Sequence, residues 1–183
     1  MSQAWTQAGY LKALRFAAEA HMGQTVPGTT LPYLVHVTLV GMEVIAALRV
    51  EPDHDQELAV ECALLHDVVE DTRTTLDQLR ATFGRTVANG VLALSKDKTL
   101  PKDRQLADSL NRIRDQPIEI GMVKLADRIT NLQPPPAHWS REKAAAYREE
   151  AVLIHRSLKD ASPVLATRLS EKIEAYRSFV PHV

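Results

Sequence analysis

The stretch ALLHDVVEDT, residues 63–72, places four ionisable side chains directly after an apolar run. His66 and Asp67 are adjacent, and Glu70 and Asp71 follow in the next turn of a helix, so the pattern predicts two neighbouring columns of polar side chains. An imidazole and a carboxylate that reach one divalent ion, with two more carboxylates beside it, would explain the crowding. The alternative is a set of solvated charges at a helix end. It is weaker, because carboxylates near a helix C-terminus oppose the macrodipole and repel one another.

The spacing of apolar residues along the rest of the chain indicates an all-α protein. Apolar residues recur at helical intervals nearly everywhere, and the alternation typical of strands is scarce. Thr75 and Gln78 predict a capping box, Gly84 a helix end, and the prolines at 134–136 a helix stop. We predict helices over about 3–22, 33–49, 55–71 and 75–84, a short one to about 95, one after the charged loop SKDKTLPKDRQ, one over EIGMVKLADRITNLQ, one capped by Ser140 to about 159, and a last one with Pro163 in its first turn.

Composition limits the class of protein. The chain has 183 residues, 45% of them hydrophobic, and we expect one domain over residues 1–183. A formal net charge of -1 and a pI near 6.7 provide no general basic field, so nucleic acid is not an expected partner. The single cysteine, Cys62, and a start unlike a signal peptide favour a reducing, cytoplasmic location. The apolar runs are far shorter than the roughly 20 residues that cross a bilayer, so no membrane is expected as a partner.

His36 and Asp127 are the residues best suited to complete a metal site from other helices. His36 lies among apolar residues in LPYLVHVTLVG, where a histidine is more often a satisfied core residue than a ligand. Asp127 has apolar neighbours in GMVKLADRITNLQ, and a buried carboxylate needs a partner. That partner is either a metal ion or a nearby cation, Lys124 or Arg128, and the sequence leaves both interpretations open.

The order H, HD and D resembles the ligand pattern of the HD-domain metal-dependent phosphohydrolases. The stretches ALLHDVVEDT, KDKTLPK and VKLADRITNL together resemble the hydrolase domain of the RelA/SpoT family, and the short chain is similar to the small alarmone hydrolases of that family. The resemblance covers about residues 10 to 155, with the motifs in the expected order. It implies an HD-domain helical bundle of about eight to ten helices.

The resemblance also implies a reaction, a cofactor and a set of site residues. The reaction removes pyrophosphate from the 3′ position of guanosine tetra- or pentaphosphate and leaves GDP or GTP. The implied ligands of one Mn²⁺ ion are His36, His66, Asp67 and Asp127. Glu70 and Asp71 are the implied catalytic residues, which orient or deprotonate the attacking water. The implied substrate-binding residues are Asn131, Lys98, Arg104, Arg128, Lys143 and Tyr147.

Some of these substrate-binding residues have ordinary alternatives. The loop SKDKTLPKDR, residues 95–104, is rich in cations, but aspartates lie between them, so a solvated charged loop is as consistent as contact with phosphates. Asn131 lies one turn after Asp127, which suits a hydrogen bond to substrate or to a ligand, and its alternative is an exposed amide. Tyr147 can stack on a base or bond to a phosphate.

The chain departs from the family pattern at two points. Family members usually read HxGQxRK after the first helix, with the Arg and Lys beside the nucleotide, whereas HMGQTVPGTT supplies Thr25, Val26 and Pro27. The usual proline after the next histidine is also missing, because Val37 follows His36. Since two expected cations are absent, we expect altered nucleotide selectivity, with adenosine alarmones such as ppApp considered beside ppGpp.

Two other functions fit the same residues. Another HD-domain nucleotide phosphatase would share the metal and release orthophosphate, and a non-catalytic sensor would bind a nucleotide without turnover. The presence of the Glu70 and Asp71 pair favours an enzyme, because a pure binder needs no carboxylates to activate water. We therefore expect a hyperphosphorylated purine nucleotide as the partner and leave a homodimer open.

Overall fold

The computed structural model of the protein describes residues 4–180, and the regular structure in that part of the chain is helical. An isolated bridge pairs Thr25 with Pro32 in the loop after the first helix. The α-helices are α1 (Gln7–Ala20), α2 (Leu34–Leu48), α3 (Gln56–Leu65), α4 (Val68–Asp71), α5 (Leu76–Leu94), α6 (Lys102–Arg114), α7 (Ile118–Asn131), α8 (Arg141–Leu158) and α9 (Pro163–Ala175), and the 3₁₀ helices are η1 (Lys159–Ala161) and η2 (Tyr176–Phe179). The all-α prediction is confirmed. None of the helices in the described part combines the length and apolar content needed to span a bilayer.

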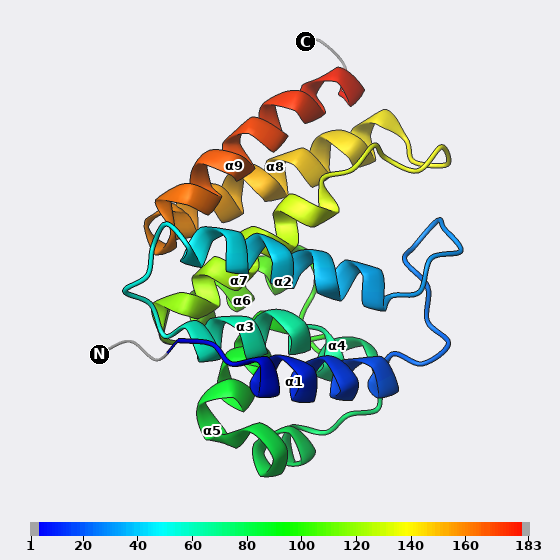
Figure 1. The fold of residues 1–183 in the computed structure, drawn as a ribbon. Helices are drawn as coiled ribbons and strands as arrows, with labels where there is room; N and C mark the ends of the chain where they lie inside the picture. The colour runs from blue at the N-terminus through cyan, green and yellow to red at the C-terminus, as the bar shows by residue number, and fades with distance from the viewer. Residues whose placement is uncertain (1–3, 181–183) are drawn as a thin grey trace.

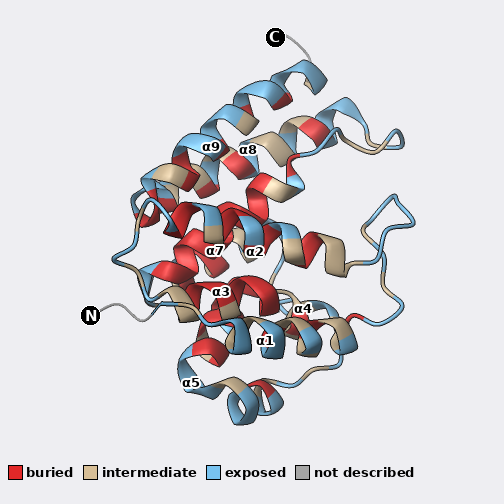
Figure 2. Cartoon of the chain, viewed as in Figure 1, coloured by how far each residue is buried: buried red, intermediate tan, exposed pale blue. Residues whose placement is uncertain are grey.

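Helix α7 lies at the centre of the bundle. It contacts α2, α3, α8 and α9, while α8 and α9 lie side by side at one end and α1 and α5 lie at the other (Figure 1). Every residue of α7 from Glu119 to Ile129 is buried, and Figure 2 shows the buried residues concentrated on α3 and α7. The apolar side chains around α7 explain this position, because a helix that is apolar on all sides is stable only inside a core. Lys124, Asp127 and Arg128 are thereby carried into the interior.

Several predicted helix signals form the expected contacts. Thr75 Oγ1 accepts a hydrogen bond from the Gln78 amide at 3.2 Å, and Gln78 Oε1 accepts one from the Thr75 amide at 2.8 Å, which completes the capping box. Gly84 takes φ 85° and interrupts α5, which is therefore two helical segments in sequence. Ser140 caps α8, and Pro163 occupies the first turn of α9.

Three predicted boundaries are wrong. The first helix is predicted from about residue 3, a position outside the described residues. In the structure α1 begins at Gln7, because Thr6 caps it. The Thr6 hydroxyl oxygen accepts a 3.0 Å hydrogen bond from the Gly9 amide. The helix expected over 55–71 is interrupted after Leu65, and α4 is a separate short helix. Arg104 does not lie in a loop, since α6 already begins at Lys102.

Two carboxylates, the buried Glu43 and the partly buried Glu51, connect α2 and the segment after it to α9. Glu43 of α2 accepts two hydrogen bonds from the guanidinium group of Arg168, from Nε at 2.5 Å and from Nη2 at 2.7 Å. Glu51, just after α2, accepts a hydrogen bond from the Val164 amide at 2.9 Å and one from the Ser162 hydroxyl at 2.5 Å. These contacts fix the direction of α2, the helix that carries His36.

Candidate functional site

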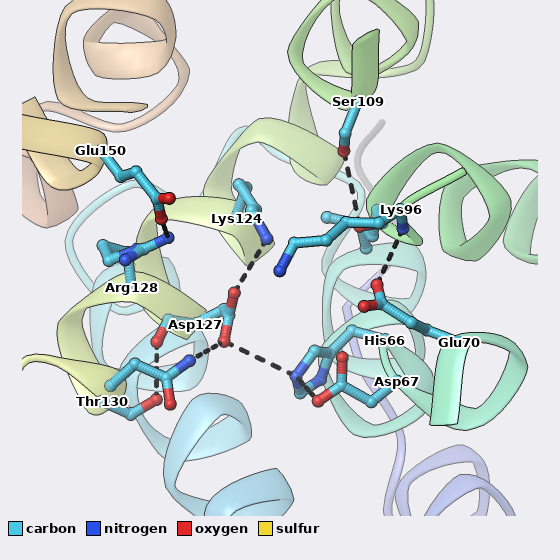
Figure 3. A network of polar contacts seen from close by, with 12 residues as sticks. His66, Asp67, Glu70, Lys96, Ser109, Lys124, Asp127, Arg128, Thr130 and Glu150 are labelled. Atoms are coloured by element: carbon cyan, nitrogen blue, oxygen red, sulfur yellow. Dashed lines mark hydrogen bonds and ion pairs between the residues drawn. The ribbon is translucent and has the colours of Figure 1, made fainter. Parts of the chain in front are cut away.

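The four predicted metal ligands converge at one point from separate segments. His36 comes from α2, His66 and Asp67 from the break between α3 and α4, and Asp127 from α7. The Nε2 atoms of the two histidines are 3.2 Å apart, and Asp67 Oδ2 lies 2.8 Å from His66 Nε2 and 3.7 Å from His36 Nε2. Asp127 Oδ1 lies 3.5 Å from His36 Nε2 and 3.8 Å from His66 Nε2, and Figure 3 shows it facing His66 and Asp67. The structure therefore brings these four side chains within reach of a common centre.

The break in the backbone explains how two adjacent residues face one centre. Neighbours on a continuous α-helix point about 100° apart. Asp67 instead has φ -104° and ψ -3°, near the bridge region, and this unwinds the chain between α3 and α4. The side chains of His66 and Asp67 then meet at 2.8 Å. The expected polar columns on one helix are therefore replaced by a turn followed by the short helix that carries Glu70 and Asp71.

The donor set fits a divalent cation. His66 Nδ1 is 2.8 Å from the Ala63 carbonyl oxygen, which only accepts, so Nδ1 carries a hydrogen and Nε2 is the ring nitrogen that faces the centre. Two imidazole nitrogens and two carboxylate oxygens form a mixed nitrogen and oxygen site typical of transition metals. Burial alone would lower the pKa of His66, but the charges of Asp67 and Asp127 raise it to about 9, so the two carboxylates favour a positive charge at this ring.

Asp127 has Lys124, one of the partners that the sequence left open, and also faces the two histidines. Its Oδ2 pairs with Lys124 Nζ at 3.0 Å, while its Oδ1 faces the histidines. Asn131 Nδ2 donates to the same Oδ1 at 2.5 Å, so the Asn131 amide holds the carboxylate although the residue is exposed. The Thr130 hydroxyl donates to the Asp127 carbonyl at 2.9 Å and lies 3.4 Å from His36 Nδ1. The contacts of Asn131 and Thr130 orient the side chains of Asp127 and His36 toward the centre.

Glu70 and Asp71 lie beside this centre on α4. Glu70 Oε2 accepts a hydrogen bond from the Lys96 amide at 2.8 Å, and Figure 3 shows the carboxylate next to Asp67. Burial raises the pKa of Glu70, and the Lys96 amide opposes that shift. A carboxylate with a raised pKa accepts a proton more readily near neutral pH than an ordinary glutamate does. Lys98 Nζ donates to the Glu70 carbonyl at 2.6 Å and lies 3.5 Å from Asp71 Oδ1.

The predicted substrate-binding residues fall into different surroundings. Lys98 contacts the Glu70 carbonyl and the Asp71 carboxylate, and Lys96 extends its side chain toward Lys124 and Asp127 (Figure 3). Arg104 lies on the exposed first turn of α6. Cationic side chains therefore lie beside the centre on the side of the loop after α5, and the Lys98 side chain is itself 65% exposed.

Arg128, Lys143 and Tyr147 form a second group with Trp139. The Arg128 guanidinium lies 4.4 Å from the centre of the Tyr147 ring, and Lys143 Nζ lies 4.3 Å from that of Trp139. Arg128 Nη2 pairs with Glu150 at 3.1 Å, but its buried Nε and Nη1 have no hydrogen-bond partner among the described residues. Buried donors of this kind suit an anion. The aromatic face of Trp139 was not anticipated from the sequence.

Sequence reasoning also missed Tyr33 and Gln24. The Tyr33 hydroxyl donates to Asp67 Oδ2 at 2.5 Å, and Gln24 Nε2 donates to the Asp71 carbonyl at 2.7 Å. A signal for Tyr33 was present, because it precedes His36 by one helical turn and therefore lies on the same side of α2. The contact of Gln24 joins segments far apart in the chain, and a single sequence gives no spacing that predicts it.

Known proteins resemble this chain in sequence and in fold. A family model described as an HD domain matches residues 13–164. The guanosine-3′,5′-bis(diphosphate) 3′-pyrophosphohydrolase MESH1 of Danio rerio is 32% identical over 168 residues, which cover 88% of this chain and 90% of the relative. Its Homo sapiens counterpart is 32% identical over 166 residues, covering 87% and 89%. A solved structure of a metazoan ortholog of SpoT that hydrolyses ppGpp has a TM-score of 0.78 at 27% identity and covers 94% of this chain and 98% of that one. The chain therefore belongs to the HD-domain family and groups there with the MESH1 proteins.

Proposed function

We propose that this protein is a metal-dependent 3′-pyrophosphohydrolase that converts (p)ppGpp into GDP or GTP and pyrophosphate. The convergence of His36, His66, Asp67 and Asp127 beside the Glu70 and Asp71 pair is the observation that carries the proposal. The MESH1 relatives, named for this reaction, align with most of the chain, which supports the same activity.

An HD-domain hydrolase implies a divalent metal, and the described residues contain a cluster, His36, His66 and Asp67, whose donor atoms lie within 4.8 Å of one another. We propose one Mn²⁺ ion, held by these three residues and Asp127. When bound, a divalent ion supplies Lewis acidity and neutralises charge on phosphoryl oxygens. Fe²⁺, Co²⁺ and Zn²⁺ also suit nitrogen and carboxylate donors, so manganese is to be tested against them.

The protein side chains supply orientation and proton transfer in this proposal. Water attacks the phosphorus bonded to the 3′ oxygen, the bond between these two atoms breaks, and pyrophosphate leaves while the ribose hydroxyl regains a proton. The carboxylates of Glu70 and Asp71 orient the attacking water and accept its proton. The Lys96 amide fixes Glu70, and Lys98 fixes the backbone of the same helix through the Glu70 carbonyl.

We assign the surrounding cations to the phosphate groups of the substrate. Lys98 and Arg104 are proposed to attract the phosphates at the loop side of the centre, and Arg128 to offer its unpartnered buried donors. Lys143 and Tyr147 are proposed to contact the nucleotide from α8, and Asn131 to bond to the substrate or to keep Asp127 in place.

We propose that the enzyme also accepts (p)ppApp. The loop between α1 and α2 has Val26 and Pro27 where the family usually has two cations beside the nucleotide, which removes contacts that favour guanine. Measured kcat/KM values for ppGpp and ppApp test this selectivity directly. Comparable values support it, and a strong preference for ppGpp rejects it.

Product analysis separates the proposed reaction from its rivals. Purified protein loaded with Mn²⁺ is incubated with ppGpp, and the products are resolved by anion-exchange chromatography. GDP and pyrophosphate in equal amounts are expected. Release of orthophosphate indicates another HD-domain phosphatase, and unchanged ppGpp with measurable binding indicates a nucleotide sensor.

We further propose that residues 1–183 act as one HD-type hydrolase domain in the cytoplasm. One hydrophobic core extends from Ala13 in α1 to Tyr176 after α9, which supports a single domain. Cys62 is buried and free, which suits a reducing compartment. Whether the domain forms a homodimer is measured by analytical ultracentrifugation.

A further inference from the structure

Tyr33 contacts the metal centre without belonging to the proposed ligand set. Its hydroxyl donates to Oδ2 of Asp67 at 2.5 Å. The same oxygen lies 2.8 Å from His66 Nε2 and 3.7 Å from His36 Nε2, so it is the Asp67 atom that faces both histidines. A phenol keeps its hydrogen at neutral pH and an ionised carboxylate only accepts, so Tyr33 is the donor in this contact.

The Tyr33 ring is held between two histidine rings. Its centroid lies 4.7 Å from that of His21 and 5.3 Å from that of His36. His21 is only 3% exposed, and its Nδ1 lies 2.8 Å from Gln24 Oε1. Because Gln24 Nε2 donates to the Asp71 carbonyl at 2.7 Å, its Oε1 must face His21, and His21 Nδ1 is the donor. One side of the Tyr33 ring therefore packs against His21, which Gln24 connects to the Asp71 carbonyl.

Asp67 needs such support because its backbone provides little. It lies in the break between α3 and α4, and no continuous helix fixes the direction of its side chain. A carboxylate that can rotate presents either oxygen, or neither, to the histidines. A partner outside the ligand set that fixes the rotation of a metal ligand raises metal affinity, because the site is then formed before the ion arrives.

We propose that Tyr33 is a positioning residue for the metal centre, whose hydroxyl holds the Asp67 carboxylate so that Oδ2 faces His36 and His66. The inference rests on the proposed function only in that the centre binds a divalent ion. Tyr33 is neither a metal ligand nor a substrate contact in this role, and it acts through Asp67 alone.

The Tyr33→Phe variant tests this role, because it removes one hydroxyl and keeps the ring between His21 and His36. Isothermal titration calorimetry with Mn²⁺, without nucleotide, is expected to show a Kd raised about 10- to 100-fold. Activity at saturating Mn²⁺ is expected to return toward the wild-type kcat, with an unchanged KM for ppGpp. Tyr10→Phe is the matched control, since Tyr10 packs against Trp5 instead, and its Kd should equal that of the wild type.

An equal Mn²⁺ affinity in Tyr33→Phe and wild type overturns the inference. If the Tm of Tyr33→Phe in EDTA falls at the same time, the hydroxyl has a purely structural role. The melting curve in EDTA also verifies that the variant is folded. If Tyr33→Phe weakens Mn²⁺ binding but the wild type leaves ppGpp intact, the inference stands and the proposed function fails.

Discussion

At the scale of single residues, the site depends on side chains that the sequence reveals by type and on others that it hides. His66, Asp67 and Asp127 were recognisable because charged groups interrupt apolar stretches at positions where solvation is poor. Tyr33 was not recognised, because its spacing from His36 alone does not distinguish it from an ordinary core tyrosine, and only the structure shows its hydroxyl contacting Asp67. The charged residues stand out because a charge buried away from water needs a compensating partner, whereas a half-buried phenol such as Tyr33 does not.

The roles of Glu70 and Asp71 are tested by isosteric substitutions. Glu70→Gln and Asp71→Asn keep the shape of each side chain and remove its ability to accept a proton. We expect kcat for ppGpp to fall by about 10²- to 10⁴-fold in each variant, while calorimetry shows that Mn²⁺ still binds.

The control for these variants is Glu149→Gln, which changes an exposed glutamate on α8 that pairs with Arg148. Its kcat should match that of the wild type. Unchanged turnover in both Glu70→Gln and Asp71→Asn would reject a catalytic role for the pair.

At the scale of secondary-structure elements, the helix signals predicted most starts and stops but missed the break that creates the site. The apolar periodicity continues from residue 55 through 71, so it predicts one helix, and the unwound turn at His66 and Asp67 leaves no mark in the pattern. The interruption at Gly84 was predictable, because a φ of 85° is costly for any residue with a side chain and a glycine in a helical pattern therefore indicates a helix end. Breaks that depend on tertiary contacts are visible only in the folded chain.

The contact between α2 and α9 makes a prediction about stability. Arg168→Met leaves the Glu43 carboxylate, which is 7% exposed, without its guanidinium partner. We expect the free energy of unfolding to fall by about 1–3 kcal/mol, because a buried charged acceptor loses its hydrogen bonds. Urea denaturation followed by circular dichroism measures the change.

Arg177→Met is the matched control, since Arg177 and Glu174 are 61% and 63% exposed and their ion pair is screened by water. We expect that variant to change the free energy of unfolding by only about 0–1 kcal/mol. An equal effect of the two substitutions would show that the contact of Glu43 with Arg168 does not stabilise the fold.

At the scale of the whole molecule, the apolar character of α7 decides the arrangement. The sequence predicted that apolar residues surround Asp127 on most sides, and the structure places α7 at the centre of the bundle for that reason. The positions of α2 and of the break after α3 relative to α7 could not be predicted, because they depend on contacts such as Glu43 with Arg168 that join distant segments. The site is assembled by this packing.

Metal binding should therefore stabilise the whole fold. An ion that binds only the folded chain raises the free energy of unfolding by about 2.7 kcal/mol when its concentration is 100 times its Kd. We expect Mn²⁺ to raise the urea midpoint of the wild type and EDTA to reverse the effect. Asp127→Asn, which weakens one of the four proposed ligands, should lose most of this response. An identical midpoint in Mn²⁺ and in EDTA for the wild type would contradict a metal centre in the core.

The most direct test of the central claim is the anomalous difference density of crystals soaked in manganese. A single strong peak is predicted among His36, His66, Asp67 and Asp127, with both Nε2 atoms and one oxygen of each carboxylate as its nearest protein atoms. The absence of a peak there, with manganese bound elsewhere or nowhere, would contradict the account.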